Sequence, residues 1–458
     1  MQTNFTALQL ENKRIAEADP ILRSCVHCGF CTATCSTYVL LGDERDSPRG
    51  RIYLIKDMFE HDRDASPEVT RHVDRCLSCL SCMTTCPSGV DYMHLVDLAR
   101  AHITETGQRS PKDRFMRRLL ASVVPYPGRF RAALLAGAIA KPFRRLFAKA
   151  GLHEMAAMLE FAPNPFSLLG RGDSKVQRIG AVRSRVILLK GCAQQVLRPD
   201  INNATARLLS RIGVEVVSVK GAGCCGALVH HMGLENSAVA QVKRNVDAWW
   251  KVIDVEPIDA IIVTASGCGT TVKDYGHMLK HQPDYEYQGR QIGELTKDIA
   301  EFLVGYDLGP PKRWSSLRVA YHSACSMQHG QKLNEQPRTL LKNAGFAVVE
   351  IPEGHICCGS AGTYNILQPE LARQLRDRKL DNIDHVKPDI IATGNIGCIT
   401  QLQSGTETPV VHTIQLIDWA YGGPCPKGLE HLKDRVNEVP GSDSEIPELP
   451  AKAVATQR

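Results

Sequence analysis

The chain has 458 residues, of which 43% are hydrophobic and 23% are charged, and its formal net charge is +6. These values are typical of a globular protein with two or three domains. The small positive charge gives no reason to expect nucleic acid as a partner, and no uncharged apolar run is long enough to cross a bilayer.

Cysteine is the most informative residue type in the sequence, which contains 17 of them. The opening segment has no apolar core behind a basic start, so we expect the protein to stay in the cytoplasm. In that reducing compartment, so many cysteines indicate metal binding or redox chemistry rather than structural disulfides.

Two cysteine runs near the start of the chain, at 25–35 and 76–86, share the spacing C-x2-C-x2-C-x3-C. Two such runs are the pattern of a two-cluster ferredoxin. Three closely spaced thiolates can surround three corners of one cubane, whereas the fourth is one residue out of step and faces the other cluster. We therefore assign one [4Fe-4S] cluster to Cys25, Cys28, Cys31 and Cys86, and a second to Cys76, Cys79, Cys82 and Cys35.

A pair of structural zinc sites is the alternative interpretation of these runs. Zinc usually binds two separated C-x2-C pairs, which fits two runs of four cysteines poorly. Ser36 departs from the ferredoxin pattern, in which proline usually follows the fourth cysteine, as Pro87 does in the second run. Proline at that place shapes the backbone and is not a ligand, so we expect the cluster content to be unchanged.

The segment between the two runs predicts a helix, because apolar residues from Leu54 to Phe59 recur at helical spacing after a turn at Pro48. A second helix is expected after Cys86. The first domain, residues 1–108, is therefore predicted to be α-helical. It resembles the helical ferredoxin domain of fumarate reductase-type iron–sulfur subunits.

A basic helical linker is predicted over residues 109–182. Its part from 111 to 150 contains ten Lys or Arg and a single acid, Asp113, interleaved with apolar residues. A basic amphipathic stretch of this kind can lie on an anionic membrane surface or on an acidic partner. A linker helix with a solvated basic face explains the pattern equally well.

From residue 183 onward, the sequence alternates between predicted strands and helices and then repeats itself. Each copy leads from a first cysteine through a helix and a strand to a Cys-Cys-Gly, and 31 residues separate the two cysteine positions in both copies. A further helix and an apolar strand lead to a Gly-Cys. Because the unit recurs after about 130 residues, we predict two pseudo-symmetric α/β repeats, 183–305 and 306–425, built from βαβ units.

The repeats carry eight cysteines at matched positions, all at predicted strand ends or loops, where α/β sheets bind ligands. The thiols can form one site near a pseudo-two-fold axis or one site in each repeat. The contents that we consider are an iron–sulfur cluster, zinc, a thiol/disulfide pair or plain buried cysteines. The eight residues are Cys192, Cys224, Cys225, Cys268, Cys325, Cys357, Cys358 and Cys398.

These repeats resemble the cysteine-rich CCG domain of heterodisulfide reductase-type subunits, on the stretches "GCCGAL" and "ICCGSAG". The resemblance implies an unusual iron–sulfur cluster. The family's motif ends in C-x-x-C, however, and Ala265 and Asn395 stand at its first position, so one ligand per repeat is missing. The histidines near the motifs are interpreted as packing or surface residues; they are His230, His231, His322, His329 and His355.

The order of a helical two-cluster ferredoxin domain, a linker and two CCG repeats resembles the iron–sulfur subunits of bacterial glycolate oxidases (glycolate dehydrogenases). The most specific stretches are "ILRSCVHCGFCTATC", "GDERDSPRGRIYLIK", "TASGCGTTVKDYG" and "HICCGSAGTYN". The resemblance implies that FAD-containing partner subunits oxidise glycolate, with D-lactate as a further candidate substrate, and that this chain passes electrons to the quinone pool. It also implies a peripheral position on the cytoplasmic face of the inner membrane.

Subunits of the same layout that serve lactate or glycerol 3-phosphate oxidation are the nearest alternatives. A heterodisulfide reductase-like enzyme and a zinc-dependent binding module are the others. We expect FAD only on the partners and assign no catalytic residue here, because the chain has no G-x-G-x-x-G after a strand and no Walker motif. The polar tail, 426–458, is expected to be flexible.

Overall fold

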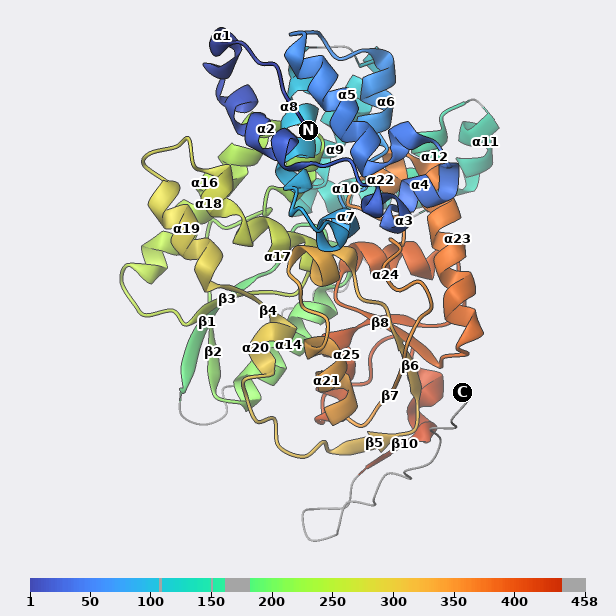
Figure 1. Ribbon diagram of the computed structural model, residues 1–458. Coiled ribbons are helices and arrows are strands. Elements are labelled where there is room, and N and C mark those ends of the chain that lie inside the picture. The colour runs from blue at the N-terminus through green and yellow to red at the C-terminus, as the bar shows by residue number, and fades with distance from the viewer. Residues whose placement is uncertain (107–108, 150, 161–181, 439–458) are drawn as a thin grey trace, which may run out of the picture.

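Figure 1 shows a helical N-terminal part that lies across two α/β units. The computed structural model describes residues 1–106, 109–149, 151–160 and 182–438. The predicted α + α/β fold class is confirmed, because the regular structure described before residue 160 is helical and each later unit contains a parallel sheet. None of the described helices is long and apolar enough to span a membrane.

Short helices enclose the two N-terminal cysteine runs. They are α1 (Ala7–Leu10), α2 (Lys13–Ser24), α3 (Phe30–Thr34), α4 (Ser36–Leu41), a 3-10 turn (Glu44–Asp46), α5 (Pro48–Glu60), α6 (Pro67–Asp74), α7 (Ser81–Thr85) and α8 (Tyr92–Glu105). The helix predicted between the runs is α5, which Ser47 caps by accepting a hydrogen bond from the Gly50 amide. Its buried face, which includes Ile55, packs with Leu95 of α8 into one core.

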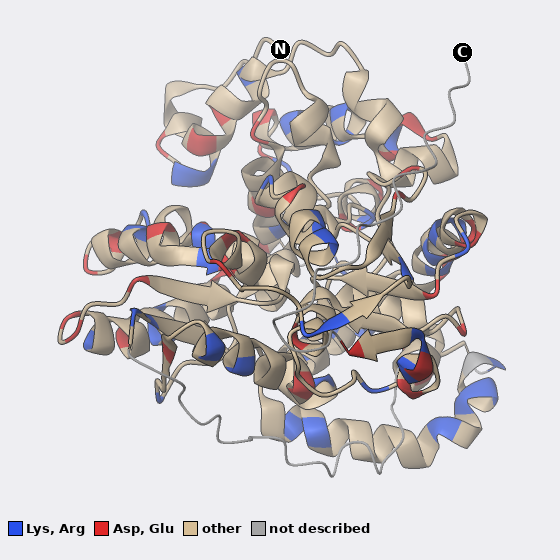
Figure 2. Ribbon diagram, turned by 90° about the horizontal axis from the view of Figure 1, so that it is seen from below, with Lys and Arg blue, Asp and Glu red and all other residues tan. Residues whose placement is uncertain are grey.

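The described part of the predicted linker is helical. It forms α9 (Pro111–Val123), α10 (Pro127–Ala140), a 3-10 turn (Lys141–Phe143), α11 (Arg144–Lys149) and α12 (His153–Glu160), and residues 161–181 lie outside the described residues. Helix α9 packs between domains, since Met116 and Leu120 are buried against Val229 and Arg117 is paired with Asp74. In contrast, α10 and α11 carry Lys and Arg without Asp or Glu along the lower edge of Figure 2.

Each α/β unit is built on a four-stranded parallel sheet. The first contains β1 (Ser184–Leu189), β2 (Val214–Val217), β3 (Ala260–Val263) and β4 (Thr296–Asp298), in the order β2-β1-β3-β4. The second contains β6 (Arg318–Tyr321), β7 (Ala347–Val349), β8 (Ile390–Thr393) and β9 (Val410–His412), in the matching order β7-β6-β8-β9. The registers also match, because Val186 pairs with Ala260 and Val319 pairs with Ile390. The internal repeat is thus a structural duplication.

Helices cover both sheets. The first unit has α13 (Gln194–Leu197), α14 (Pro199–Arg211), α15 (Ala227–His231), α16 (Glu235–Ile253), α17 (Ser266–Lys273), α18 (Tyr275–Met278), α19 (Glu286–Leu295) and α20 (Ile299–Leu303). The second has a π-helical turn (Ser326–Gly330), α21 (Gln336–Asn343), α22 (Tyr364–Leu367), α23 (Pro369–His385), α24 (Ile396–Gln403) and α25 (Thr413–Ala420). One continuous apolar core joins the two units, and Arg207 of α14 pairs with the buried Asp418 of α25.

The predicted flexible tail from residue 426 is partly wrong. Residues Glu430–Arg435 form a 3-10 helix, and β10 (Val436–Glu438) pairs antiparallel with β5 (Arg313–Ser315). Leu432 is buried in the core of the second unit, and this burial explains why a polar segment packs against the domain. Residues 439–458 lie outside the described residues.

Candidate metal centres

The two N-terminal cysteine runs adopt the same local conformation. In each run, the second cysteine is flanked by two residues with left-handed backbone, and a five-residue helix follows. The four residues and their φ values are His27 (57°), Gly29 (84°), Ser78 (49°) and Leu80 (63°). Left-handed conformation is uncommon for residues other than glycine, and here it curls each chain so that three thiols face the same side.

The first triplet lines a cavity together with a cysteine of the second run. The cysteines on its wall are Cys25, Cys28, Cys31 and Cys86, with Cys82 at its inner edge. The remaining wall is largely apolar and includes Ile52 and Val90. Because Cys28 is exposed to solvent while Cys25 is buried, this cavity lies close to the protein surface.

The second triplet lines a neighbouring cavity with the remaining cysteine of the first run. Its cysteines are Cys35, Cys76, Cys79 and Cys82. Pro48 and Tyr92 line both cavities, so the two adjoin. The structure thus brings together the two crossed sets that the spacing predicts, and both donor sets fit an iron–sulfur cluster. Burial raises the pKa of the Cys82 thiol well above its ordinary value, so a bound metal is what would hold it as a thiolate.

A buried ion pair lies against the second cavity, and the sequence analysis missed it. Arg51 and Asp46 are 1% and 0% exposed, with 3.3 Å between Nη2 and Oδ1. Arg51 also donates to Thr37 Oγ1 at 3.0 Å, and its Nη1 lies 4.0 Å from Cys35 Sγ. A buried guanidinium that is paired with a carboxylate therefore lies beside the thiols of the second cavity. Both residues belong to the stretch "GDERDSPRGRIYLIK", which is quoted above. Its many charged residues, close to the start of a predicted helix, were the signal in the sequence that pointed to an ion pair.

Each α/β repeat gathers its own four thiols at the carboxyl edge of its sheet. In the second repeat, Cys325 Sγ lies 3.4 Å from Cys357 Sγ, and the thiols of Cys357, Cys358 and Cys398 are close enough to shift one another's pKa. The first repeat has the equivalent series of interacting thiols, from Cys192 through Cys224 and Cys225 to Cys268. The prediction of one site in each repeat therefore describes the arrangement better than a single shared site.

The residues at the missing cysteine positions form the contact between the repeats. The Ser266 amide, next to Ala265, donates to the Gly394 carbonyl at 3.1 Å. Asn395 donates through Nδ2 to Ser266 Oγ at 3.0 Å. Ser266 Oγ is also 2.7 Å from Ser326 Oγ. Alanine and asparagine in place of cysteine thus belong to a polar interface rather than to a thiol site.

The second cavity adjoins the thiols of the second repeat. The Cys357 amide donates to Ser36 Oγ at 3.1 Å, and both residues are buried. Leu77 packs against Ile356 and Cys357 in an apolar cluster that Cys79 borders. The serine that replaces the usual proline is therefore a hydrogen-bond acceptor between the helical part and the second repeat.

Buried polar groups behind the thiols differ between the repeats. In the first, Asn245 of α16 donates to the Cys224 carbonyl at 2.8 Å and Tyr275 donates to the Cys225 carbonyl at 2.9 Å. In the second, Lys379 of α23 is fully buried and its Nζ donates to the Glu353 carbonyl at 2.7 Å. Burial lowers the pKa of Lys379, while the neighbouring thiols act in the opposite direction, with Cys358 first.

Comparisons with known proteins agree with this geometry. The family model described as "4Fe-4S dicluster domain" matches residues 24–90, and the model described as "Cysteine-rich domain" matches twice, at 186–273 and 319–403. The two adjoining cysteine cavities and the duplicated thiol sites, taken with these matches, define the chain as an iron–sulfur protein of the electron-transfer class.

Relatives over nearly the full length specify the family. The glycolate oxidase iron-sulfur subunit of Escherichia coli (strain K12) is 43% identical over 420 residues, which cover 92% of this chain and 99% of the relative. The probable glycolate oxidase iron-sulfur subunit of Bacillus subtilis (strain 168) is 31% identical over 89% of this chain and 94% of the relative. Lactate utilization protein A of Oceanobacillus iheyensis is 26% identical over 51% of this chain. The chain belongs to the family of glycolate oxidase iron–sulfur subunits.

The crossed cavities generate a prediction about paired cysteine variants. Cys35→Ser should convert the cluster held by Cys76, Cys79 and Cys82 into a labile three-iron form, because one thiolate is lost from the second cavity. The matched variant Cys86→Ser should do the same to the cluster of the first triplet. EPR spectra of the two anaerobically purified variants would show different surviving clusters. Loss of the same cluster in both variants would contradict the crossed arrangement.

Proposed function

We propose that this chain is the electron-transfer subunit of a glycolate dehydrogenase complex, which takes electrons from an FAD-containing subunit and delivers them towards the quinone pool. The observation that carries the proposal is the unbroken succession of thiol sets, from the exposed Cys28 through the second cavity to Cys357 of the second repeat. The names of the two nearly full-length relatives support glycolate rather than lactate as the substrate of the complex.

In the proposed arrangement, the first cavity holds one [4Fe-4S] cluster and the second cavity holds another. Their ligands are Cys25, Cys28, Cys31 and Cys86, and Cys76, Cys79, Cys82 and Cys35. When bound, such clusters supply one-electron redox chemistry. The cysteines of the repeats would hold a further iron–sulfur cluster or zinc. Arg51, which is paired with the buried Asp46, lies beside the second set.

The two-electron chemistry is assigned to partner subunits. Oxidation of an alcohol to a carbonyl removes a hydride equivalent, which requires a flavin or nicotinamide. The exposed side chains around Cys28 support a docking face for such a subunit. Val26, Phe30 and Tyr53 are 66%, 62% and 59% exposed, and exposed apolar side chains that gather in one place typically mark an interaction site.

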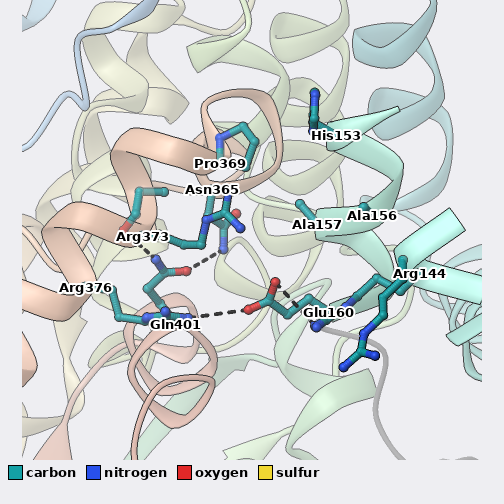
Figure 3. Close-up of a pocket in the computed structure, with 12 residues that line it drawn as sticks. Arg144, His153, Ala156, Ala157, Glu160, Asn365, Pro369, Arg373, Arg376 and Gln401 are labelled. Atoms are coloured by element: carbon teal, nitrogen blue, oxygen red, sulfur yellow. Dashed lines mark hydrogen bonds and ion pairs between the residues drawn. The ribbon is translucent and has the colours of Figure 1, made fainter. Parts of the chain in front are cut away.

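A second surface supports peripheral contact with an anionic membrane on the cytoplasmic side. Four apolar side chains of α10, α11 and the 3-10 turn between them are exposed to solvent near basic residues; they are Leu135, Ile139, Phe143 and Leu146. Beside them, Figure 3 shows a pocket between α12 and α23 with Arg144, Arg373 and Arg376 on its wall and Glu160 between two of them. Exposed apolar side chains beside basic residues favour contact with an anionic lipid surface, through apolar burial and electrostatic attraction.

The electron-transfer role predicts that glycolate oxidation and quinone reduction depend on different subunits. The purified chain should not oxidise glycolate, whereas adding it to the flavin subunits should restore quinone reduction. Cys79→Ser should lower the quinone-linked rate by about tenfold or more without changing the KM for glycolate, because the loss affects electron flow and not substrate binding. Cys425→Ser, outside all four thiol sets, is the control. Glycolate oxidation by the chain alone, or full quinone reduction without it, would overturn the proposal.

The membrane surface predicts a charge-dependent association. Each basic residue near an anionic leaflet contributes about 1 kcal/mol. Replacing Arg144, Arg145 and Lys149 by Gln should therefore weaken binding to phosphatidylserine-containing vesicles by roughly 100-fold at low salt. The control replaces three exposed basic residues of the first repeat, Lys220, Arg244 and Lys251. Co-sedimentation measures both, and equal binding of the two variants would contradict this assignment.

A further inference from the structure

His322 lies at the carboxyl end of β6, where the thiols of the second repeat gather. Its amide donates to the Ala392 carbonyl at 2.8 Å and so continues the pairing of β6 with β8. The residue is 2% exposed. A ring nitrogen of His322 and the Sγ atoms of Cys358 and Cys398 all lie within 4.8 Å of one another. A fixed backbone therefore presents the imidazole to two of the four thiols.

The imidazole is incompletely bonded among the described residues. His322 Nε2 is buried and has no hydrogen-bond partner there. An unsatisfied buried polar atom destabilises the fold, and most such atoms in proteins have a partner. A nitrogen left without a partner next to two thiols has the chemistry of a metal ligand, since imidazole and thiolate are the usual ligands of zinc and are also found on iron–sulfur centres.

The first repeat lacks this group. Leu189 ends β1 three residues before Cys192, as His322 follows β6 three residues before Cys325. The matching registers of the two sheets make these positions equivalent. Leu189 is buried among the apolar core residues of its unit. The duplication has therefore kept the thiols in both repeats but has placed an imidazole in only one.

A buried positive charge near the thiols of the second repeat also favours a bound metal centre there. Lys379 is fully buried, and its ammonium donates to a main-chain carbonyl rather than to a carboxylate in the described part of the chain. A buried cation needs compensating negative charge, and metal-bound thiolates at this place supply it.

We propose that His322, together with Cys358 and Cys398, is a ligand of a mixed thiolate–imidazole centre in the second repeat, which takes a thiophilic transition metal, either the iron of a cluster or zinc. The imidazole supplies the donor that the repeat lacks at Asn395. The first repeat, with leucine at the equivalent position, holds a different, thiol-only site. This inference rests on the proposed function in one respect, namely that the thiols of the second repeat bind a metal.

The test compares His322→Ala with Leu189→Ala in the full chain purified anaerobically. Iron, sulfide and zinc are counted for each variant, and EPR of the two ferredoxin clusters serves as the check on folding. We expect His322→Ala to lose the metal of one centre while both ferredoxin signals persist, and Leu189→Ala to retain it. His322→Cys, which restores a donor, should recover metal, and His355→Gln should have no effect.

A direct readout separates a ligand from a hydrogen-bond donor. If the metal is zinc, X-ray absorption should show a nitrogen neighbour at about 2.0–2.1 Å in the wild type that His322→Cys replaces by sulfur. If it is iron, 15N-histidine labelling should give a strong nitrogen coupling in pulsed EPR that His322→Cys removes. Unchanged metal content in His322→Ala, or a nitrogen signal that survives His322→Cys, would overturn the assignment.

Failure of the underlying proposal would look different. A wild-type chain with no zinc and no iron beyond two [4Fe-4S] clusters would show that the second repeat binds no metal, and the His322 assignment would fall with it. The glycolate-linked electron transfer of the complex would be unaffected by that result, so the two failures are distinguishable.

Discussion

The contact between Ser36 and Cys357 fixes the place where the helical part meets the thiols of the second repeat. A hydrogen bond between two buried groups in different domains fixes their separation and orientation, because either group would be left unsatisfied if the contact opened. The apolar packing of Leu77 on Ile356 excludes water from the same place. As a result, the second ferredoxin cavity and the thiols of the second repeat share one dry interface, whereas the first cavity reaches the surface at Cys28.

The two repeats have the same scaffold and different surroundings for their thiols. In the second, His322 and the buried Lys379 replace the apolar and neutral groups of the first, Leu189 and Asn245. The first repeat instead meets the helical part through a charged surface, where His94 stacks on His277 at 3.4 Å between ring centroids. Although burial acts against it, hydrogen bonding to Asp274 and Asp91 raises the pKa of His94 to about 10. One repeat therefore continues the series of buried thiols, and the other anchors the helical part.

The sequence predicted those features that depend on local spacing. Such features are the cysteine runs with fixed intervals, the helices with a regular apolar period, such as α5, and the duplicated Cys-Cys-Gly motif. Each depends on residues that are close together in the sequence. The fourth strand of each sheet, β4 and β9, was not predicted, because these short strands follow the last cysteine of each repeat and so lie outside the repeated motifs. The tail was misjudged for a related reason, since β10 gains its stability from pairing with β5 rather than from its own polar sequence.

Contacts between distant segments could not be predicted from one sequence. Ser36 was expected to be a neutral departure from the proline pattern, and its role became visible only when Cys357 was placed beside it. His322 was interpreted as a packing residue for the same reason, because its neighbours Cys358 and Cys398 lie on other strands. Arg51 and Lys379 are ordinary basic residues in the sequence, and only their burial in the fold distinguishes them from surface cations.

In the proposed series of redox sites, the ferredoxin part is followed by the second repeat and not by the first. The spin relaxation of the reduced cluster at Cys76, Cys79 and Cys82, measured by pulsed EPR in the wild type, Cys398→Ser and Cys268→Ser, tests this order. An iron centre in the second repeat should make the relaxation faster in the wild type and in Cys268→Ser than in Cys398→Ser, whereas zinc, which is diamagnetic, would leave all three alike. Slower relaxation in Cys268→Ser alone, or equal relaxation in all three proteins, would contradict a redox site in the second repeat.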